Sequence, residues 1–352
     1  MNSRSASQLS RRGLLAAGGA TALGALLAAC GSGGGDGSKG GAAGAGSSAV
    51  PKKGPWSFTD DQPRTLTAPS TPSRIVAFTG TAAALVDFGL DQQIVGVFGE
   101  TRTADGKADP QAGDLNVDKV TVIGNAYGEF DIEKYAALRP DLLVTHMYDP
   151  GAFWYVPDES KDKILQVNPA VAAITVARVP MTQPIEHYAK LAESLGADLG
   201  AKKVTDAKAR FEAAAESVRQ AAKATGGIKV LAGSGSPDLF YVSNPQISTD
   251  LMYFAQLGVD FVVPTKLDAG GYYEGLSWEN ANKYPADVIL LDDRSTSLQP
   301  KDLAGKPAWG QLPAVKAGQI TPWSSVPRFS YAGAAPLLEG LAKAIRSAKK
   351  VS

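Results

Sequence analysis

Aromatic and arginine side chains recur in the segments that follow the predicted strands of this chain. Loops at the carboxyl ends of strands are where α/β proteins place the side chains that contact a ligand. Tyrosine and tryptophan supply apolar faces with a polar edge, and arginine supplies charged donors, so this set is suited to binding a small molecule. Such aromatics are also common as half-buried packing residues. The candidate ligand contacts are Thr79, Tyr127, Tyr148, Trp154, Tyr155, Arg178, Tyr273, Trp323, Arg328 and Tyr331.

Patterns for catalysis or for direct metal binding are weak. The segment 233–236 reads Gly-Ser-Gly-Ser after a predicted strand, but the third glycine of a dinucleotide fingerprint is missing, and no Gly-x-Ser-x-Gly elbow occurs. Two distant histidines do not form the cluster that Zn²⁺ or Mn²⁺ needs. His146, at the end of a predicted strand, is expected to be a hydrogen-bonded wall residue, with ligation of haem iron as the alternative. We therefore expect a binding protein without catalytic residues, and a secreted α/β enzyme is the remote alternative.

The composition of the chain excludes further functions and bounds the number of domains. The chain has 352 residues, with 35 Lys+Arg against 35 Asp+Glu, and one cysteine. Zero net charge argues against a nucleic-acid partner, because phosphate binding depends on an excess of basic side chains. A single cysteine permits no intramolecular disulfide. The length suffices for one large domain or two medium ones.

The N-terminal segment has the features of an export signal. A basic head and a short apolar run over 1–29 predict a signal peptide, and Ser10-Arg11-Arg12-Gly13-Leu14-Leu15 resembles the twin-arginine type. Leu27-Ala28-Ala29-Cys30 resembles a lipobox, so Cys30 is expected to carry the lipid that anchors the protein to the outer face of the cytoplasmic membrane. Residues 30–55, rich in Gly, Ala and Ser, predict a flexible linker.

The body that must position the candidate contacts alternates strands with helices. Short β-branched runs predict strands over 75–78, 94–98, 142–145, 173–176, 228–232 and 288–292. Each is followed by a helical pattern, which predicts the α/β class with parallel-rich sheets.

Two similar blocks and one long helix predict two lobes. The segments 130–144 and 276–290 share a cap residue, a glutamate in the first turn, about two turns of helix, a proline and a buried strand. Between them, apolar residues at helical spacing predict a helix over 201–226. We therefore expect Rossmann-like lobes over 56–200 and 227–352, joined by this helix, with the ligand cleft between them and only modest closure.

Taken in this order, several weak motifs resemble one family. They are the strand opening at 74–78, the block 133–144, the long helix, the block 279–291 and Trp309-Gly310-Gln311-Leu312-Pro313. From about residue 56 to the end, the chain resembles the periplasmic-binding-protein family of iron-siderophore, haem and cobalamin importers. The segments 56–61, 125–138, 154–163 and 276–288 more narrowly resemble actinobacterial lipoproteins that capture hydroxamate siderophores such as ferrioxamine.

The resemblance implies a function and two kinds of contact. The ligand would be a ferric siderophore handed to the permease of an ABC transporter, with haem or cobalamin as the alternatives. The iron of a ferric siderophore is already fully coordinated by the siderophore, so the protein would need no metal ligand or cofactor. Arg328 and then Arg178 are the expected donors to hydroxamate oxygens. Related binders place an arginine in the first-lobe loop before the docking glutamate, but here 125–129 reads Asn-Ala-Tyr-Gly-Glu, so that contact is not carried over to this chain.

Two glutamates are the expected docking residues. By motif, Glu133 and Glu279 would each present a carboxylate from the tip of one lobe to arginines of the permease. The alternative is that each merely complements the N-terminus of its helix. We expect a monomer.

Overall fold

The computed structural model describes residues 54–62 and 64–352. The expected signal peptide (1–29), Cys30 and all but two residues of the expected linker (30–55) lie outside the described residues. All described residues belong to one compact unit. No helix in the described part is both long and apolar enough to cross a membrane.

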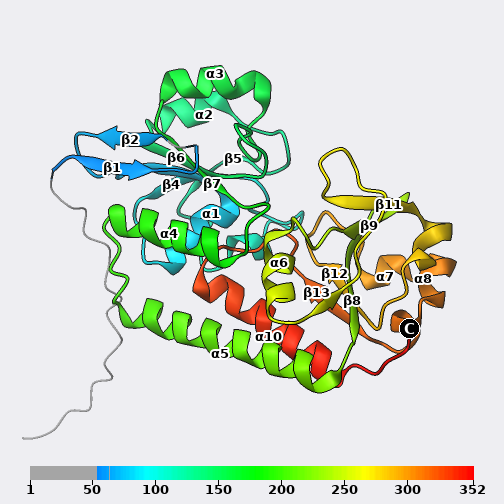
Figure 1. Cartoon of the computed structure of the whole chain (residues 1–352). Coiled ribbons are helices and arrows are strands. Elements are labelled where there is room, and N and C mark those ends of the chain that lie inside the picture. Colours follow the sequence, from blue (N-terminus) through cyan, green and yellow to red (C-terminus); the bar gives the residue numbers. More distant parts are fainter. Residues whose placement is uncertain (1–53, 63) are drawn as a thin grey trace, which may run out of the picture. The chain divides into compact units, whose positions relative to one another are not determined.

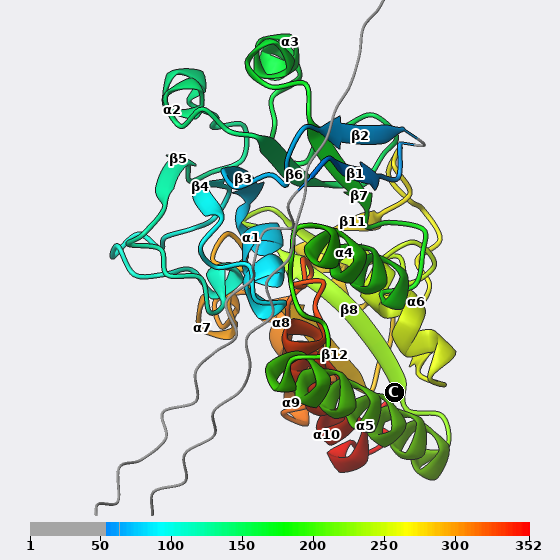
Figure 2. The same ribbon diagram turned by 90° about the vertical axis from the view of Figure 1, so that its left-hand side faces the viewer.

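The first lobe is built on a parallel five-stranded sheet in the order β5-β4-β3-β6-β7. The central strands Ile75–Phe78 and Leu142–Met147 are buried on both faces, which explains their runs of β-branched and aliphatic residues. Figure 2 shows α2 and α3 on one face of the sheet and α1 and α4 on the other. The strands are β3 (Ile75–Phe78), β4 (Ile94–Phe98), β5 (Thr121–Gly124), β6 (Leu142–Met147) and β7 (Val171–Thr175). The helices are α1 (Thr79–Asp87), η1 (Pro110–Ala112), α2 (Ile132–Ala137), α3 (Asp158–Val167) and α4 (Thr182–Ser194), and a hairpin of β1 (Trp56–Thr59) and β2 (Thr65–Ala68) precedes them.

The second lobe carries a mixed sheet in the order β11-β9-β8-β12-β13, with β10 beside β8. Its centre is parallel, while β9 pairs antiparallel with β8 and with β11. The strands are β8 (Lys229–Gly235), β9 (Leu239–Ser243), β10 (Asp260–Phe261), β11 (Tyr273–Ser277), β12 (Val288–Asp292) and β13 (Ile320–Trp323). The helices are α6 (Thr249–Gln256), η2 (Trp278–Lys283), α7 (Pro300–Leu303), α8 (Pro307–Gln311) and α9 (Pro313–Lys316).

Two helices run along each other beneath both lobes (Figure 1). α5 (Lys202–Thr225) occupies the position of the predicted long helix and ends at Gly226, whose φ of 57° is the left-handed conformation that glycine favours. α10 (Tyr331–Ser347) packs against it, and Arg210 of α5 donates two hydrogen bonds of 2.7 Å to Glu339 of α10. One hydrophobic core includes residues of both sheets and both helices. The connection is therefore two helices thick, which stiffens it.

The two similar blocks differ in their helices. In the first, Asp131 caps α2 by accepting a hydrogen bond from the Lys134 N–H. In the second, the expected α-helix is the 3₁₀ helix η2, so that prediction is wrong. Asparagines are weak helix formers because their side chains bond locally, and Asn280 donates to the Ser277 hydroxyl at 2.9 Å.

Candidate functional site

Two adjoining hollows lie at the carboxyl ends of the strands. The aromatic hollow, approximately 430 Å³, belongs to the first lobe, and the interlobe hollow, approximately 370 Å³, is lined from both lobes. Tyr148, Asp149 and Trp154 line both hollows. The aromatic hollow is also lined by Tyr127, Phe153, Tyr155, Asp158 and Glu159, and the interlobe hollow by Ser234, Tyr241, Ser243, Ser248, Tyr272, Tyr273, Arg294, Trp323, Ser325 and Val326, among others.

Four aromatic rings cluster into a wall where the hollows adjoin, and two of them, Tyr148 and Trp154, line both hollows. The Tyr148 and Trp154 rings lie 4.5 Å apart, centroid to centroid, and Trp154 lies 5.3 Å from Tyr155. Tyr127 meets Trp154 and Tyr155 edge-on at 5.7 and 5.1 Å, and it is 71% exposed. The wall thus offers ring faces to a ligand while one ring stands free in solvent.

The loop that carries this wall folds back onto the end of β6. The Thr145 hydroxyl donates to the Trp154 carbonyl at 2.9 Å, and the Trp154 N–H donates to the His146 carbonyl at 3.0 Å. Tyr155 has a left-handed φ of 64° and donates its hydroxyl to the Glu100 carboxylate. Burial and this carboxylate raise the Tyr155 pKa, so its hydroxyl stays protonated.

Arg294, two residues after the end of β12, places a cation in the interlobe hollow. Its Nε and Nη2 donate to the buried Asp292 carboxylate at 3.0 and 2.7 Å, and Asp292 also accepts from the Ser297 hydroxyl. Burial alone would lower the Arg294 pKa, but its bonds to Asp292 and the charge there outweigh burial and raise it. Among the described residues nothing accepts a hydrogen bond from Nη1, so the guanidinium is held by one edge and has donors left for a ligand.

Trp323, at the end of the neighbouring strand β13, is held by a buried carboxyl group. Its Nε1 donates to Asp250 Oδ2 at 2.5 Å, and Asp250 lies in the first turn of α6. Burial raises the Asp250 pKa from 3.8 to about 6, although the Trp323 hydrogen bond opposes the shift. Because the folded pKa is above the unfolded one, protonation stabilises the fold at low pH, and this contribution is lost as pH rises from 3.8 through about 6.

Asp250→Asn should therefore stabilise the protein at neutral pH. The amide oxygen still accepts from Trp323, and the cost of a buried charge disappears. The free energy of unfolding of the variant minus that of the native chain should rise by about 2 kcal/mol between about pH 4 and about pH 7. Urea unfolding at the two pH values measures this difference, and a difference independent of pH would show that Asp250 does not titrate in this range.

The structure brings together six of the ten candidate contacts. Tyr127, Tyr148, Trp154, Tyr155, Tyr273 and Trp323 line the two hollows. Thr79 does not, because it is fully buried and its hydroxyl lies 3.0 Å from the Phe98 carbonyl and 2.7 Å from the Thr101 hydroxyl. Tyr331 does not either, because its ring packs on Phe88 and on Phe211 of α5.

Arg328 also points away from the hollows. Its Nη1 lies 3.5 Å from Oδ2 of Asp87 at the end of α1. Burial raises the Asp87 pKa, while Arg328 and the Ser330 hydroxyl oppose the rise. The guanidinium fits against Gly113, where a Cβ would lie 1.8 Å from Nη1. The expectation that Arg328 faces the ligand is therefore wrong in this structure, because the side chain ties α1 to the segment before α10.

Arg294 is the basic side chain that the sequence reasoning missed, although the same rule could have found it. It follows the predicted strand 288–292 within two residues, in Asp292-Asp293-Arg294. The expectation for His146 is also wrong. His146 is fully buried among Phe78, Tyr188 and Phe329, and neither ring nitrogen has a hydrogen-bond partner in the described chain. Burial lowers its pKa to about 3, so it is neutral.

Glu133 and Glu279 are both exposed, at the first turns of α2 and η2. Hydrogen bonds from its own N–H and from the Ser277 hydroxyl lower the Glu279 pKa. Neither carboxylate forms a salt bridge with any residue in the described ranges. Each of these two glutamates therefore presents an exposed carboxylate that has no ion-pair partner in the described ranges.

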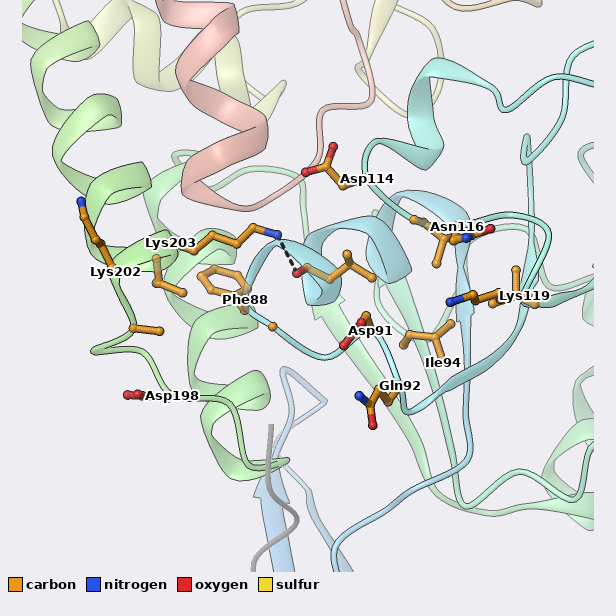
Figure 3. A pocket seen from close by; sticks show the side chains of 16 residues that line it. Phe88, Asp91, Gln92, Ile94, Asp114, Asn116, Lys119, Asp198, Lys202 and Lys203 are labelled. Atoms are coloured by element: carbon orange, nitrogen blue, oxygen red, sulfur yellow. Dashed lines mark hydrogen bonds between the residues drawn. The ribbon is translucent and has the colours of Figure 1, made fainter. Parts of the chain in front are cut away.

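A larger hollow of approximately 840 Å³ lies between the first lobe and the start of α5 (Figure 3). Both acidic and basic side chains line it, and Lys203 donates to the Val86 carbonyl at 3.4 Å. It shares no lining residue with the two strand-end hollows and contains none of the candidate contacts. No group of three His, Cys, Asp or Glu side chains in the described part could hold a metal ion.

Two α/β lobes with an aromatic-walled hollow at the strand ends define a two-lobed solute-binding protein. The chain belongs to the periplasmic binding protein family, whose model matches residues 75–327. Among solved structures, it is similar to DesE, a ferric-siderophore receptor protein from Streptomyces coelicolor. The two are 55% identical, with a TM-score of 0.81, over 84% of this chain and 100% of that chain. The family and the two-lobed α/β fold predicted from the sequence are confirmed.

More distant structures share the fold alone. The petrobactin-binding protein YclQ from Bacillus subtilis is 18% identical over 84% of this chain and 98% of that chain, with a TM-score of 0.60. The haem-binding protein RhuT from Roseiflexus is 19% identical over 78% of this chain and 98% of that chain, with a TM-score of 0.55. No curated protein sequence matches the chain.

Proposed function

We propose that the two hollows bind a ferric hydroxamate siderophore of the ferrioxamine type, and that the protein delivers it to the permease of an ABC transporter for iron uptake. The main support is the 55% identity with a ferric-siderophore receptor over that protein's whole length. Within the site, support comes from the two aromatic rings, Tyr148 and Trp154, that line both hollows.

The side chains that line the hollows suit a metal ion that is already fully coordinated by its own organic ligand. A ferric trihydroxamate fills the iron coordination sphere with its own six oxygens, so the site needs walls and donors rather than metal ligands. The Tyr148 and Trp154 faces pack against the siderophore backbone. Arg294 replaces Arg328 as the proposed donor, with its Nη1 directed to hydroxamate oxygens that carry negative charge. The same hollows offer haem no histidine, because His146 lies beneath the wall and lines neither of them.

Tryptophan fluorescence tests the ligand class, because Trp154 and Trp323 line the site. The purified protein is titrated in parallel with ferrioxamine, ferrichrome, a ferric catecholate, haem and cobalamin, with the iron-free hydroxamate as the control. We expect saturable quenching by the ferric hydroxamates, with ferrioxamine binding tightest. Tight binding of haem alone, with the hydroxamates inert, would refute the siderophore proposal.

Export and lipid anchoring complete the proposal. Residues 1–29 would direct export and Cys30 would carry the diacyl anchor, which leaves the body on a tether outside the membrane. Cys30→Ser should then move the protein from the detergent phase to the aqueous phase in Triton X-114 partitioning. A native chain already in the aqueous phase would contradict the anchor.

A further inference from the structure

Arg178 lines neither strand-end hollow and instead connects the two lobes at their edge. From the loop after β7, its Nη1 donates to the Tyr148 carbonyl, to the Asp149 carboxylate and to the Tyr272 hydroxyl, each at 3.1 Å. Its Nη2 donates to the Gly270 carbonyl at 3.0 Å. Two of these partners belong to the first lobe and two to the second, so one guanidinium joins both rims.

The partners of Arg178 are themselves parts of the site. Tyr148, Asp149 and Tyr272 line the interlobe hollow, and the Tyr272 hydroxyl also lies 3.1 Å from Asp149 Oδ1. The positions of these three groups therefore depend on a side chain that does not reach the space where a ligand would lie.

Both ends of the contact are held in place before the side chain acts. The main chain around Arg178 is itself bonded to the second lobe, because the Arg178 N–H donates to the Ile247 carbonyl at 2.9 Å and the Met181 N–H donates to the Thr249 carbonyl at 2.9 Å. On the second lobe, Asp268 accepts hydrogen bonds from the N–H groups of Gly270, Tyr272 and Tyr273. The rim loop is thus preorganised to receive the guanidinium.

The backbone of Arg178 supports a specific role for this contact. Its φ is 61°, in the left-handed region that costs energy in residues with a Cβ, and long side chains are uncommon there. Asparagine tolerates this conformation well, so it can replace Arg178 without disturbing the chain path.

We propose that Arg178 is a positioning residue that latches the rims of the interlobe hollow and slows the exchange of bound ligand. The part of this proposal that concerns ligand exchange rests on the proposed function, which identifies the ligand. The latch itself concerns the distance between the lobes and does not depend on that ligand. The side chain of Arg178 is 44% exposed and that of Asp149 is 54% exposed. Salt will therefore screen part of the contact, and its effect on rates will be moderate.

The test compares Arg178→Asn, Arg178→Lys and a control variant in the full chain. Arg210→Ala is the control, because it removes another multidentate arginine that joins α5 to α10 away from the hollows. Stopped-flow fluorescence with ferrioxamine gives the association and dissociation rates. Arg178→Asn should raise the dissociation rate about threefold to tenfold, with a smaller change in association. Arg178→Lys, which keeps the charge without the fork, should fall between it and the native chain.

A second measurement needs no ligand. Spin labels at Lys163→Cys on α3 and Lys301→Cys on α7, both exposed positions, report the distance between the lobes in a Cys30→Ser background. Arg178→Asn should broaden the distance distribution, and Arg210→Ala should not. If ferrioxamine fails to bind any variant, the siderophore proposal fails while the distances still decide the latch. Distributions and dissociation rates that match those of the native chain would refute the latch.

Discussion

Arg294→Gln should lower the affinity for a ferric hydroxamate by about 10-fold to 100-fold, which corresponds to the loss of one or more charged hydrogen bonds. Arg294 is the only basic side chain in the described lining of the interlobe hollow. Its Nε and Nη2 are occupied by Asp292, so the donors that would be lost to the ligand are those of Nη1. Fluorescence titration with ferrioxamine, under conditions where urea unfolding shows that the variant is folded, measures the change.

The matched control is the same substitution at Arg328. Arg328→Gln removes the cation beside the buried Asp87 and should lower the free energy of unfolding by about 3 kcal/mol, while the dissociation constant stays the same. Arg294→Lys separates charge from geometry, because it keeps a partner for Asp292 and loses the planar fork. If Arg328→Gln weakened binding and Arg294→Gln did not, the donor would be assigned to the wrong loop.

Arg294 and Arg328 show how far the position of a residue after a strand predicts a ligand contact. Arg294 follows the predicted strand 288–292, while Arg328 follows β13, a strand that the sequence did not predict. Their directions are set by carboxylates that the fold supplies. Arg328 turns to Asp87, which is far away in sequence, and Arg294 turns to Asp292, two residues earlier. The position of a loop after a strand thus predicts where the loop lies in the fold. The direction of a charged side chain on that loop depends on a buried partner of opposite charge.

The same limit explains why Thr79 and Tyr331 do not line the hollows as predicted. Thr79 follows β3 as predicted, but it is the first residue of α1, and its hydroxyl contacts groups at the end of β4 and just beyond. Tyr331 begins α10, and the packing of that helix on α5 turns the ring away from the hollows. Which face of a helix meets a neighbour is a tertiary property that strand-end spacing does not contain.

The strands and the helix that are defined by a local sequence pattern could be predicted. Strands β3, β4 and β12 have the bounds that their β-branched runs predict, since buried parallel strands require such residues. Helix α5 differs from its prediction by one residue at each end, because an amphipathic pattern and Gly226 define it locally. The antiparallel pairing of β9 with β8 and β11 had no such signal, since strand order and direction arise from distant partners.

Reversing the charge at both Glu133 and Glu279 should reduce siderophore-dependent iron uptake to background, while the affinity for ferrioxamine stays the same. Each single reversal should cost about tenfold or more, because a lysine facing a permease arginine places like charges together. Both carboxylates are exposed on different lobes and outside the lining of the strand-end hollows. Uptake of radioactive iron by cells whose only gene copy carries Glu133→Lys and Glu279→Lys measures the effect.

Net charge must be separated from position in this experiment. Glu193→Lys and Glu212→Lys change the total charge equally and lie at exposed positions on α4 and α5. If docking depends on the two tip carboxylates, this second pair should leave uptake near the native level. The alternative role, complementing a helix N-terminus, predicts only a loss of stability of about 0.3 to 1 kcal/mol per site, with uptake retained. Uptake lost equally in both double variants would mean that total charge, rather than these carboxylates, governs delivery.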